Sequence, residues 1–337
     1  MDLKNVTMKD IAKYTGVSTA TVSRVLNDNY PVNIETKKKV LKAIEELNYE
    51  PNLVAKNLRS RKSNLVAIIV ADIKNPYYVS IAKEIDDYLF EEGYSLITCS
   101  TDESIEKEAD IIRLLLSKHI DGIVIAPSDS ENSKLTGLIE QHVPIVLVDR
   151  KINVLPIPFV GTNNFKEAYN LTEYLIKKGH EKVGVMTGKL NTSTGKERLE
   201  GFKMAMGNYG LPIDEKWIFY GDFDEKQAYE VLSLFLKNNK DLPTALLSCN
   251  NLMTKGTIIA LNEENIKIPE DISIVSFGAM ENQEFFKTRI TCIEQDTSYM
   301  GKKVAELLLA QLKNGQKLKS IIVESTFIEG NSVREWN

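Results

Sequence analysis

Residues 7–27, TMKDIAKYTGVSTATVSRVLN, predict two short helices joined by a tight turn. Thr7 can cap the first helix, with Asp10 three residues later at the capping-box position. Gly16 supplies the positive φ that a sharp interhelical turn favours. Ser18 caps the second helix, whose solvent-facing residues are Thr19, Ala20, Ser23, Arg24 and Asn27. An arginine there could touch a base edge, so this is the layout of a helix-turn-helix whose second helix enters a major groove.

The charge of the chain is unevenly distributed. The 337 residues carry a net charge of −5, yet residues 1–62 hold 12 Lys and Arg against 7 Asp and Glu. The remainder holds 30 against 40, so a basic head precedes an acidic body. This distribution suits a protein that contacts phosphate with one end only. The alternative is that the charge difference arises by chance on solvated helices.

Composition limits where such a protein acts. Its 43% hydrophobic content is ample for a large core. Cys99, Cys249 and Cys292 are far apart and form no CxxC pair, as expected for core thiols in a reducing compartment. The start lacks the apolar run of a signal peptide, and no segment reaches about 18 consecutive apolar residues. We therefore expect a cytoplasmic protein that has no membrane contact.

A third helix and a short connecting segment follow. Asn33 caps this helix, and its buried stripe consists of Val40, Ala43, Ile44 and Leu47. Pro51 ends the helical pattern, and Asn52 could cap a very short helix over 53–58 before a linker over 59–64. So short a helix is marginal alone, which suggests that it folds upon binding.

From residue 65 the pattern changes to alternating strands and helices. LVAIIVA (65–71) is a continuous apolar run, as expected for a strand buried on both faces. Further strands are expected at 95–99, 121–127, 144–149, 158–161, 183–188, 217–221, 244–249 and 272–278. Helices are expected between them, first in the stretch that runs from the 65–71 strand to Glu92 and Gly93, and then over 104–118, 133–142, 164–178, 196–209, 225–238 and 251–263. The alternation predicts an α/β fold of parallel sheets, too long for one small sheet and therefore divided into two similar subdomains.

These segments together resemble the lactose/galactose repressor family of bacterial transcription regulators. The similarity begins with VTMKDIAKYTGVSTATVSRVLN and LNYEPNLVAKNLRS, which are highly specific together. It continues, in the family's order, with ADIKNPYY, KHIDGIVIAP, LVDR, GHEKVGVMTG, RLEGF, IPEDISIVSFG and IEQD.

The resemblance implies an all-α helix-turn-helix domain followed by a two-lobed, periplasmic-binding-protein-like core of parallel sheets. The expected DNA-binding domain is 1–50, followed by a hinge helix and linker over 51–64. One core lobe is expected at 65–161 with 293–320, and the other at 162–292 with 321–337. Family members bind pseudopalindromic operators as homodimers. The C-terminus has no leucine heptad, so a dimer is favoured over a coiled-coil tetramer.

By similarity, Thr19, Ala20 and Arg24 take the base-reading positions. Arg24 suits the O6/N7 edge of guanine, and the methyl groups of Thr19 and Ala20 suit a thymine methyl. The resemblance also suggests phosphate contacts by Thr7, Ser18, Thr21, Ser23, Asn27, Asn33 and Thr36. The alternative for Thr7, Ser18 and Asn33 is that they are helix caps only.

In the family, two short hinge helices pair in the minor groove and wedge their leucines into a base step. Here the hinge helix would contain Asn52 and Ala55, and Leu58 would be the wedge. Unstacking the step costs a few kcal/mol, offset by the contacts that the bent duplex makes. An ordinary amphipathic tether is the alternative.

The resemblance also implies an effector cleft between the lobes. Aromatic faces would pack on C–H surfaces, while Asp149 and Asn250 bind hydroxyls and Arg198 clamps an anion or paired hydroxyls. Strand capping by Asp149, or core packing by either tyrosine, is the alternative. The expected lining is Tyr77, Tyr78, Asp149, Val160, Thr192, Thr194, Arg198, Phe223, Asn250, Gly278 and Gln295.

The chain departs from the family pattern near this cleft. Family members commonly carry aspartate where this chain has Asn163, Asn251 and Gly278. Aspartate binds neutral hydroxyls but repels anions, so its absence with Arg198 kept predicts a negatively charged effector. A sugar acid or a sugar phosphate would fit, although both asparagines could simply be caps.

Two other classes of protein compete with this interpretation. An enzyme would need catalytic residues, but the chain has no HExxH or GxSxG motif, and in TGKLNTSTGKERLEG the glycine spacing and Glu197 do not fit a phosphate loop. The dispersed His119, His142 and His180 are expected to be structural, and no catalytic residue, metal or cofactor is predicted. A transport-type sugar-binding protein would lack the basic head. Within the family, a global carbon-catabolite regulator that responds to a phosphosugar or a partner protein is the alternative, and the direction of regulation stays open.

Overall fold

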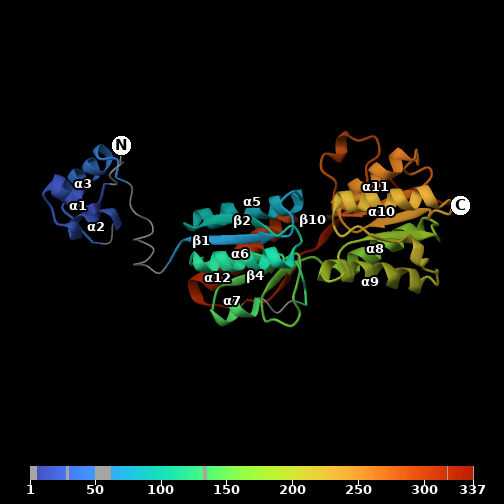
Figure 1. Cartoon of the computed structure of the whole chain (residues 1–337), viewed down its shortest axis with the longest axis horizontal. Helices are drawn as coiled ribbons and strands as arrows, with labels where there is room; N and C mark the ends of the chain where they lie inside the picture. The colour runs from blue at the N-terminus through green and yellow to red at the C-terminus, as the bar shows by residue number, and fades with distance from the viewer. Residues whose placement is uncertain (1–5, 28–29, 50–61, 132–134, 317, 337) are drawn as a thin grey trace. The chain divides into compact units, whose positions relative to one another are not determined.

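The computed structural model describes residues 6–27, 30–49, 62–131, 135–316 and 318–336. Its contacts divide the chain into two units, Met1–Lys62 and Ser63–Asn337. Figure 1 traces the chain through the helices of the first unit and then through the sheets of the second.

The first unit contains α1 (Met8–Thr15), α2 (Thr19–Asn27) and α3 (Ile34–Glu46). Their apolar faces share one core, as the sequence pattern predicted. Its buried members are Ile11, Ala12, Val22, Val25, Val40, Ala43 and Tyr49. α1 ends at Gly16, whose φ of 69° lies in the left-handed region that glycine adopts readily. These three helices confirm the predicted helix-turn-helix and its third helix.

The second unit contains two six-stranded sheets within its described residues. Sheet A has the order β11-β5-β4-β3-β1-β2, and sheet B has the order β12-β10-β9-β8-β6-β7. Sheet A consists of β1 (Leu65–Val70), β2 (Ser95–Ser100), β3 (Gly122–Ile125), β4 (Ile145–Val148), β5 (Phe159–Gly161) and β11 (Ile321–Ile322). Sheet B consists of β6 (Val183–Thr187), β7 (Ile218–Tyr220), β8 (Ala245–Ser248), β9 (Ser273–Phe277), β10 (Thr291–Gln295) and β12 (Ser325–Ile328). Their pairs are parallel, apart from β10 with β12.

Helices cover both faces of each sheet, and we call each sheet with its helices a lobe (Figure 1). On sheet A, α5 (Pro76–Glu91) and α12 (Thr297–Asn314) share one core, and α6 (Ile105–Ser117) and α7 (Thr136–Glu140) share the other. Sheet B carries α8 (Asn164–Lys177), α9 (Ser193–Asn208), α10 (Glu225–Asn238) and α11 (Asn251–Glu263). Short 3-10 turns lie at Glu215–Trp217 and Gln283–Phe285.

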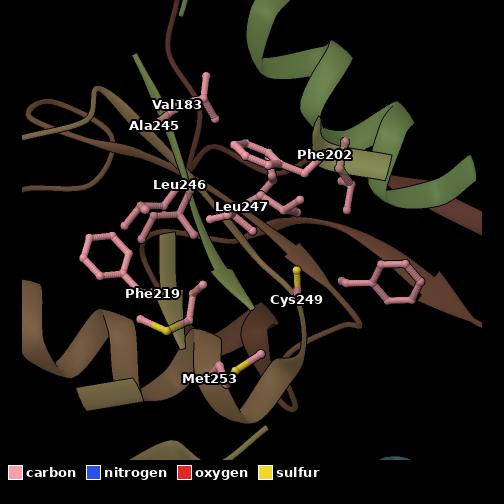
Figure 2. Packing of buried hydrophobic residues seen from close by; sticks show 14 of the residues in the cluster. Val183, Phe202, Phe219, Ala245, Leu246, Leu247, Cys249 and Met253 are labelled. Atoms are coloured by element: carbon pink, nitrogen blue, oxygen red, sulfur yellow. The ribbon is translucent and has the colours of Figure 1, made fainter. Parts of the chain in front are cut away.

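The core of the lobe built on sheet B is packed from both sides of strand β8. Figure 2 shows Leu246 and Leu247 of this strand with Phe202 of α9 and Met253 of α11 around them. Cys249 and Cys292 are buried free thiols, as expected, whereas Cys99 is partly exposed. Burial raises the pKa of Cys249 to about 12, so this thiol stays protonated and packs as a small apolar group.

The structure moves two of the expected lobe boundaries. We expected residues 293–320 in the first lobe, but β10 continues through Gln295 in sheet B. We expected residues 321–337 in the second lobe, but Ile321 and Ile322 pair with β5 of sheet A. The chain therefore crosses between the lobes after β5, after β10 and after β11. A two-residue strand is too short to show a periodic pattern, so the third crossing was expected before residue 321 rather than after Ile322.

Membrane-spanning helices were searched for in the described part of the chain. None of its helices combines the length and the apolar character that a membrane crossing requires.

Candidate DNA-reading surface and effector cavity

The ends of the first two helices are capped as the sequence predicted. The Asp10 carboxylate accepts hydrogen bonds from both the backbone N and the hydroxyl of Thr7, at 2.9 and 2.6 Å. The Ser18 hydroxyl accepts from Thr21 N at 3.1 Å and also contacts the Thr21 hydroxyl at 2.9 Å. Asn33 Oδ1 accepts from Glu35 N at 2.9 Å and caps α3. These bonds fix the direction of α2 and thus the side chains that it presents.

The exposed face of α2 holds the residues predicted to read bases. Thr19, Ala20 and Arg24 are exposed, and the Arg24 guanidinium lies over the ring of Tyr30 at 5.6 Å from its centroid. Sequence reasoning missed Tyr30, which follows α2 and is 67% exposed. Thr7 and Asn33 are exposed, while Thr21, Ser23 and Thr36 are half-buried. The side chain of Asn27, and the hinge residues Asn52, Ala55 and Leu58, lie outside the described residues.

A cavity of about 260 Å³ lies between the lobes of the second unit. Residues that follow strands line it, as the parallel topology predicts. Of the expected effector residues, the cavity is lined by Tyr77, Tyr78, Asp149, Thr194, Arg198, Phe223, Asn250, Gly278 and Gln295.

The structure does not place Val160 or Thr192 on this cavity. Val160 is the middle residue of β5 and is fully buried in the core of the first lobe. The Thr192 hydroxyl accepts from Gly195 N at 3.2 Å and caps α9. Both residues adjoin elements that reach the cavity. The side chain of Val160 packs in the core, and that of Thr192 caps α9.

Several residues that reach the cavity have a left-handed backbone. Asp149 has a φ of 63°, Glu103 of 59° and Phe223 of 65°, and Gly278 adopts 98°. A non-glycine residue in this region carries a conformational cost that surrounding contacts must offset. The chain therefore turns sharply after four different strands and presents these side chains to the space between the lobes.

Asp149 is held by the two tyrosines rather than by strand capping. The hydroxyl of Tyr77 donates to Asp149 Oδ1 at 3.0 Å, and that of Tyr78 donates to Oδ2 at 2.8 Å. Burial, and then the charge of Asp149, raises the pKa of both tyrosines well above the ordinary value. Both phenols thus stay protonated and keep donating to the carboxylate.

Arg198 is buried beside this group. Its Nε donates to Asn164 Oδ1 at 2.8 Å, its Nη1 donates to the Cys249 carbonyl at 2.6 Å, and the Phe277 ring centroid lies 3.6 Å from Cζ. Nη2 lies 4.0 Å from Asp149 Oδ1, which is too long for a hydrogen bond. Burial lowers the pKa of Arg198, although Asp149 acts against this.

A second arginine on the cavity was not predicted. Arg150 makes a bidentate ion pair with Glu103, at 2.7 and 2.5 Å, and its side chain is 3% exposed. Burial alone would lower its pKa, but Glu103, with Tyr78 and Asp149, more than compensates and raises the pKa. Arg150 Nε has no hydrogen-bond partner among the described residues and lies 3.9 Å from Asp149 Oδ2. The Asp-Arg pair of LVDR was the available signal, because it directly follows a buried strand.

Two of the three positions where the family pattern expects aspartate lie at the cavity. Asn251 and Gly278 line it, whereas Asn163 is an exposed residue that caps α8 through Lys166 N. Other carboxylates remain, because Asp72, Glu281 and Glu294 also line the cavity. Each arginine has a carboxylate nearby, because Arg150 pairs with Glu103 and Arg198 Nη2 lies 4.0 Å from Asp149 Oδ1.

A helix-turn-helix unit joined to a two-lobed core with a cavity between its lobes defines a DNA-binding regulator with an effector domain. The comparisons with known families agree. The family described as "Bacterial regulatory proteins, lacI family" matches residues 7–52. The family described as "Periplasmic binding proteins and sugar binding domain of LacI family" matches residues 63–330. The chain belongs to the LacI family, so it is a transcription regulator and not an enzyme.

Individual relatives match over almost the whole chain. The chain is 34% identical to the HTH-type transcriptional repressor PurR of Pasteurella multocida (strain Pm70), over 94% of this chain and 95% of that protein. A complex of the transcriptional regulator CelR with cellobiose is 25% identical, with a TM-score of 0.73 over 97% of this chain and 99% of that one. The Lac repressor dimer bound to operator and the anti-inducer ONPF shares the fold, with a TM-score of 0.85 at 24% identity over 98% of this chain and 100% of that one.

Proposed function

We propose that this protein is a repressor of a carbohydrate-utilisation operon, acting in the cytoplasm as a homodimer on a pseudopalindromic operator. The observation that carries the proposal is the exposed Arg24 between small side chains on a capped α2. Arg24 would read guanine, and the methyl groups of Thr19 and Ala20 would meet thymine. The name of the PurR relative, a transcriptional repressor, supports repression, and the Lac repressor structure supports a dimer on its operator.

We propose that the cavity holds a small sugar-like effector, and within that class a sugar acid. Two guanidinium N–H groups support an oxyanion: Arg150 Nε has no partner in the described chain, and Arg198 Nη2 is 4.0 Å from Asp149. The absence of carboxylates at Asn251 and Gly278 supports it as well. A neutral sugar is the second candidate, favoured by the pairing of Arg150 with Glu103 and by the cellobiose bound to CelR.

The regulation proposed is allosteric. An effector in the cavity would select one relative orientation of the lobes, and this orientation would alter the spacing of the dimer above the DNA. The hinge segments would then pair or separate. Because such coupling is reciprocal, operator DNA would change the affinity for the effector by the same factor.

The DNA-reading role is tested by genomic footprinting with the purified full chain. Arg24→Ala should abolish specific footprints, since losing a bidentate guanine contact costs about 1–3 kcal/mol at each half-site. Lys42→Ala is the matched control, because Lys42 is exposed on α3 and pairs with Glu46 at 3.6 Å. An Arg24→Ala footprint identical to that of the wild type would contradict the proposal.

The effector class is tested by calorimetric titration with sugar acids and their neutral parent sugars. We expect binding of a sugar acid that Arg198→Gln weakens, together with a change in the footprint. Tight binding of neutral sugars alone would reject the sugar acid and leave the DNA-reading role standing.

A further inference from the structure

Two asparagine side chains join the lobes at the cavity. Asn75 Nδ2 donates to Asn251 Oδ1 at 3.2 Å, and Asn251 Nδ2 donates back to Asn75 Oδ1 at 3.0 Å. Asn75 is the N-cap of α5 in the first lobe, and Asn251 is the first residue of α11 in the second. We propose that this reciprocal pair, the amide clasp, holds the lobes closed in the absence of an effector. Its consequence for regulation rests on the proposed function, but the clasp itself does not.

The capping role of Asn75 fixes the orientation of its amide. Asn75 Oδ1 accepts from Tyr77 N at 3.1 Å, so the oxygen must point to the start of α5. A carboxamide oxygen has two lone pairs, which allows it to accept from Asn251 Nδ2 as well. The Nδ2 group of Asn75 then faces the partner as a donor. A complementary partner must offer one donor and one acceptor, which a second amide does.

This complementarity explains the asparagine at position 251. Aspartate at this position, as the family pattern expects, would accept a hydrogen bond from Asn75 Nδ2. Its other carboxylate oxygen would then face Asn75 Oδ1, and the two acceptors would repel each other. The amide removes that repulsion and supplies the second hydrogen bond. Asn75 is 7% exposed and Asn251 is half-buried, so water competes less for these bonds than it would at a fully exposed site.

The clasp differs from the other contacts between the lobes. Several of those come from one segment of the second lobe: Ser193 N donates to Ser130 Oγ at 2.6 Å, and Glu197 pairs with Lys151 at 2.6 Å. The clasp instead joins the starts of α5 and α11. These helix starts carry Tyr77 and Tyr78 on one side and Asn250 on the other. Opening the clasp therefore moves the walls of the cavity.

The experiment is hydrogen exchange on the full chain, with neither DNA nor effector present. In Asn251→Asp we expect the amides at the start of α5, at residues 77–79, to exchange about tenfold faster, because one hydrogen bond is lost and a repulsion is added. The change appears in the lobe opposite to the substitution, which a local effect on α11 would not produce. An acid in the first turn suits the helix dipole, so α11 itself should remain folded.

Asn75→Asp is the reciprocal variant. It keeps the acceptor that caps α5 and removes the donor to Asn251, so we expect faster exchange at the start of α11. Asn163→Asp is the matched control, because Asn163 also stands where the family has aspartate but caps α8 away from the cavity. It should leave both peptides at the wild-type rate.

Wild-type exchange at the start of α5 in Asn251→Asp would overturn the clasp, as would an equal effect of Asn163→Asp. Neither result depends on an effector or an operator, so a failure of the proposed function would leave the measurement standing.

Discussion

Asp149 is a charged residue with an unfavourable backbone conformation at the centre of the cavity's hydrogen-bond network. Asp149 is only 6% exposed and has a left-handed backbone, and two tyrosine hydroxyls donate to its carboxylate. Gln295 Nε2 adds to the group by donating to the Tyr77 hydroxyl at 3.2 Å and to Thr162 Oγ1 at 3.1 Å. Thr162 and Gln295 lie where the chain crosses between the lobes. A ligand that competes for Asp149 would therefore act directly on the crossing strands.

His180 lies outside the cavity and predicts a pH dependence of stability. The ring is fully buried, with Nδ1 2.9 Å from Thr244 Oγ1 and the centroid of the tilted Trp336 ring 5.3 Å away. Burial lowers its pKa to about 4 from the ordinary 6.5. The folded state therefore disfavours the proton that the unfolded chain binds, so this stability is present above pH 6.5 and is lost as the pH falls towards 4.

The test is urea unfolding of the wild type and of His180→Gln at pH 7 and pH 4.5. The wild type should lose on the order of 3 kcal/mol more free energy of unfolding than the variant over this range. His142→Asn is the control, because His142 is exposed at a left-handed helix end that asparagine tolerates. Equal pH dependence in wild type and His180→Gln would refute the role of this ring.

At the scale of elements, the capping of α2 separates two roles for Ser18. Its hydroxyl accepts from Thr21 N, so Ser18→Ala should lower the free energy of unfolding of the first unit by about 1 kcal/mol. Ser18→Asp keeps a capping acceptor and should restore that stability. If Ser18 also contacts a phosphate, the added charge will weaken DNA binding in Ser18→Asp. Thermal melting and gel-shift titration measure the two effects, and full DNA affinity in Ser18→Asp would leave only the cap.

Most elements could be predicted because their signals are local. The run at 65–71 became β1, and Thr7, Ser18 and Asn33 lie at the helix starts assigned to them. Residues that follow strands, such as Asn250 and Gly278, reach the cavity because parallel strands end at one edge.

What sequence reasoning missed depends on contacts between distant segments. Arg150 and Glu103 lie 47 residues apart, and Asn75 and Asn251 lie 176 apart, so neither pair has a local pattern. Val160 was assigned to the cavity through the family alone, and only the packing of β5 showed its side chain to be in the core. The strand Ile321–Ile322 has too few residues for a period to be visible.

At the scale of the whole molecule, the uneven distribution of charge follows the division of the chain into two units. The unit that carries the excess of Lys and Arg is the one that holds the helix-turn-helix, and the acidic remainder forms the lobes and their cavity. Such a chain would contact DNA through its first unit, and the DNA phosphates would repel the acidic lobes. The proposed homodimer would need a surface on which the acidic side chains of the two copies do not repel each other.

The adjacent side chains of Phe285 and Phe286 offer such a surface in the second unit. They are 81% and 56% exposed, and large apolar side chains grouped on a surface are typical of protein interfaces. If the homodimer buries them, Phe285→Ser with Phe286→Ser should raise the dimer dissociation constant about 30-fold or more, the usual effect of losing an aromatic hot spot. Analytical ultracentrifugation over a concentration series measures this shift. Leu234→Ser is the matched control, since Leu234 is 67% exposed on α10 and its aromatic neighbour Phe235 packs against the core of the second lobe. A double variant that dissociates at the wild-type concentration would place the dimer contact elsewhere on the lobes.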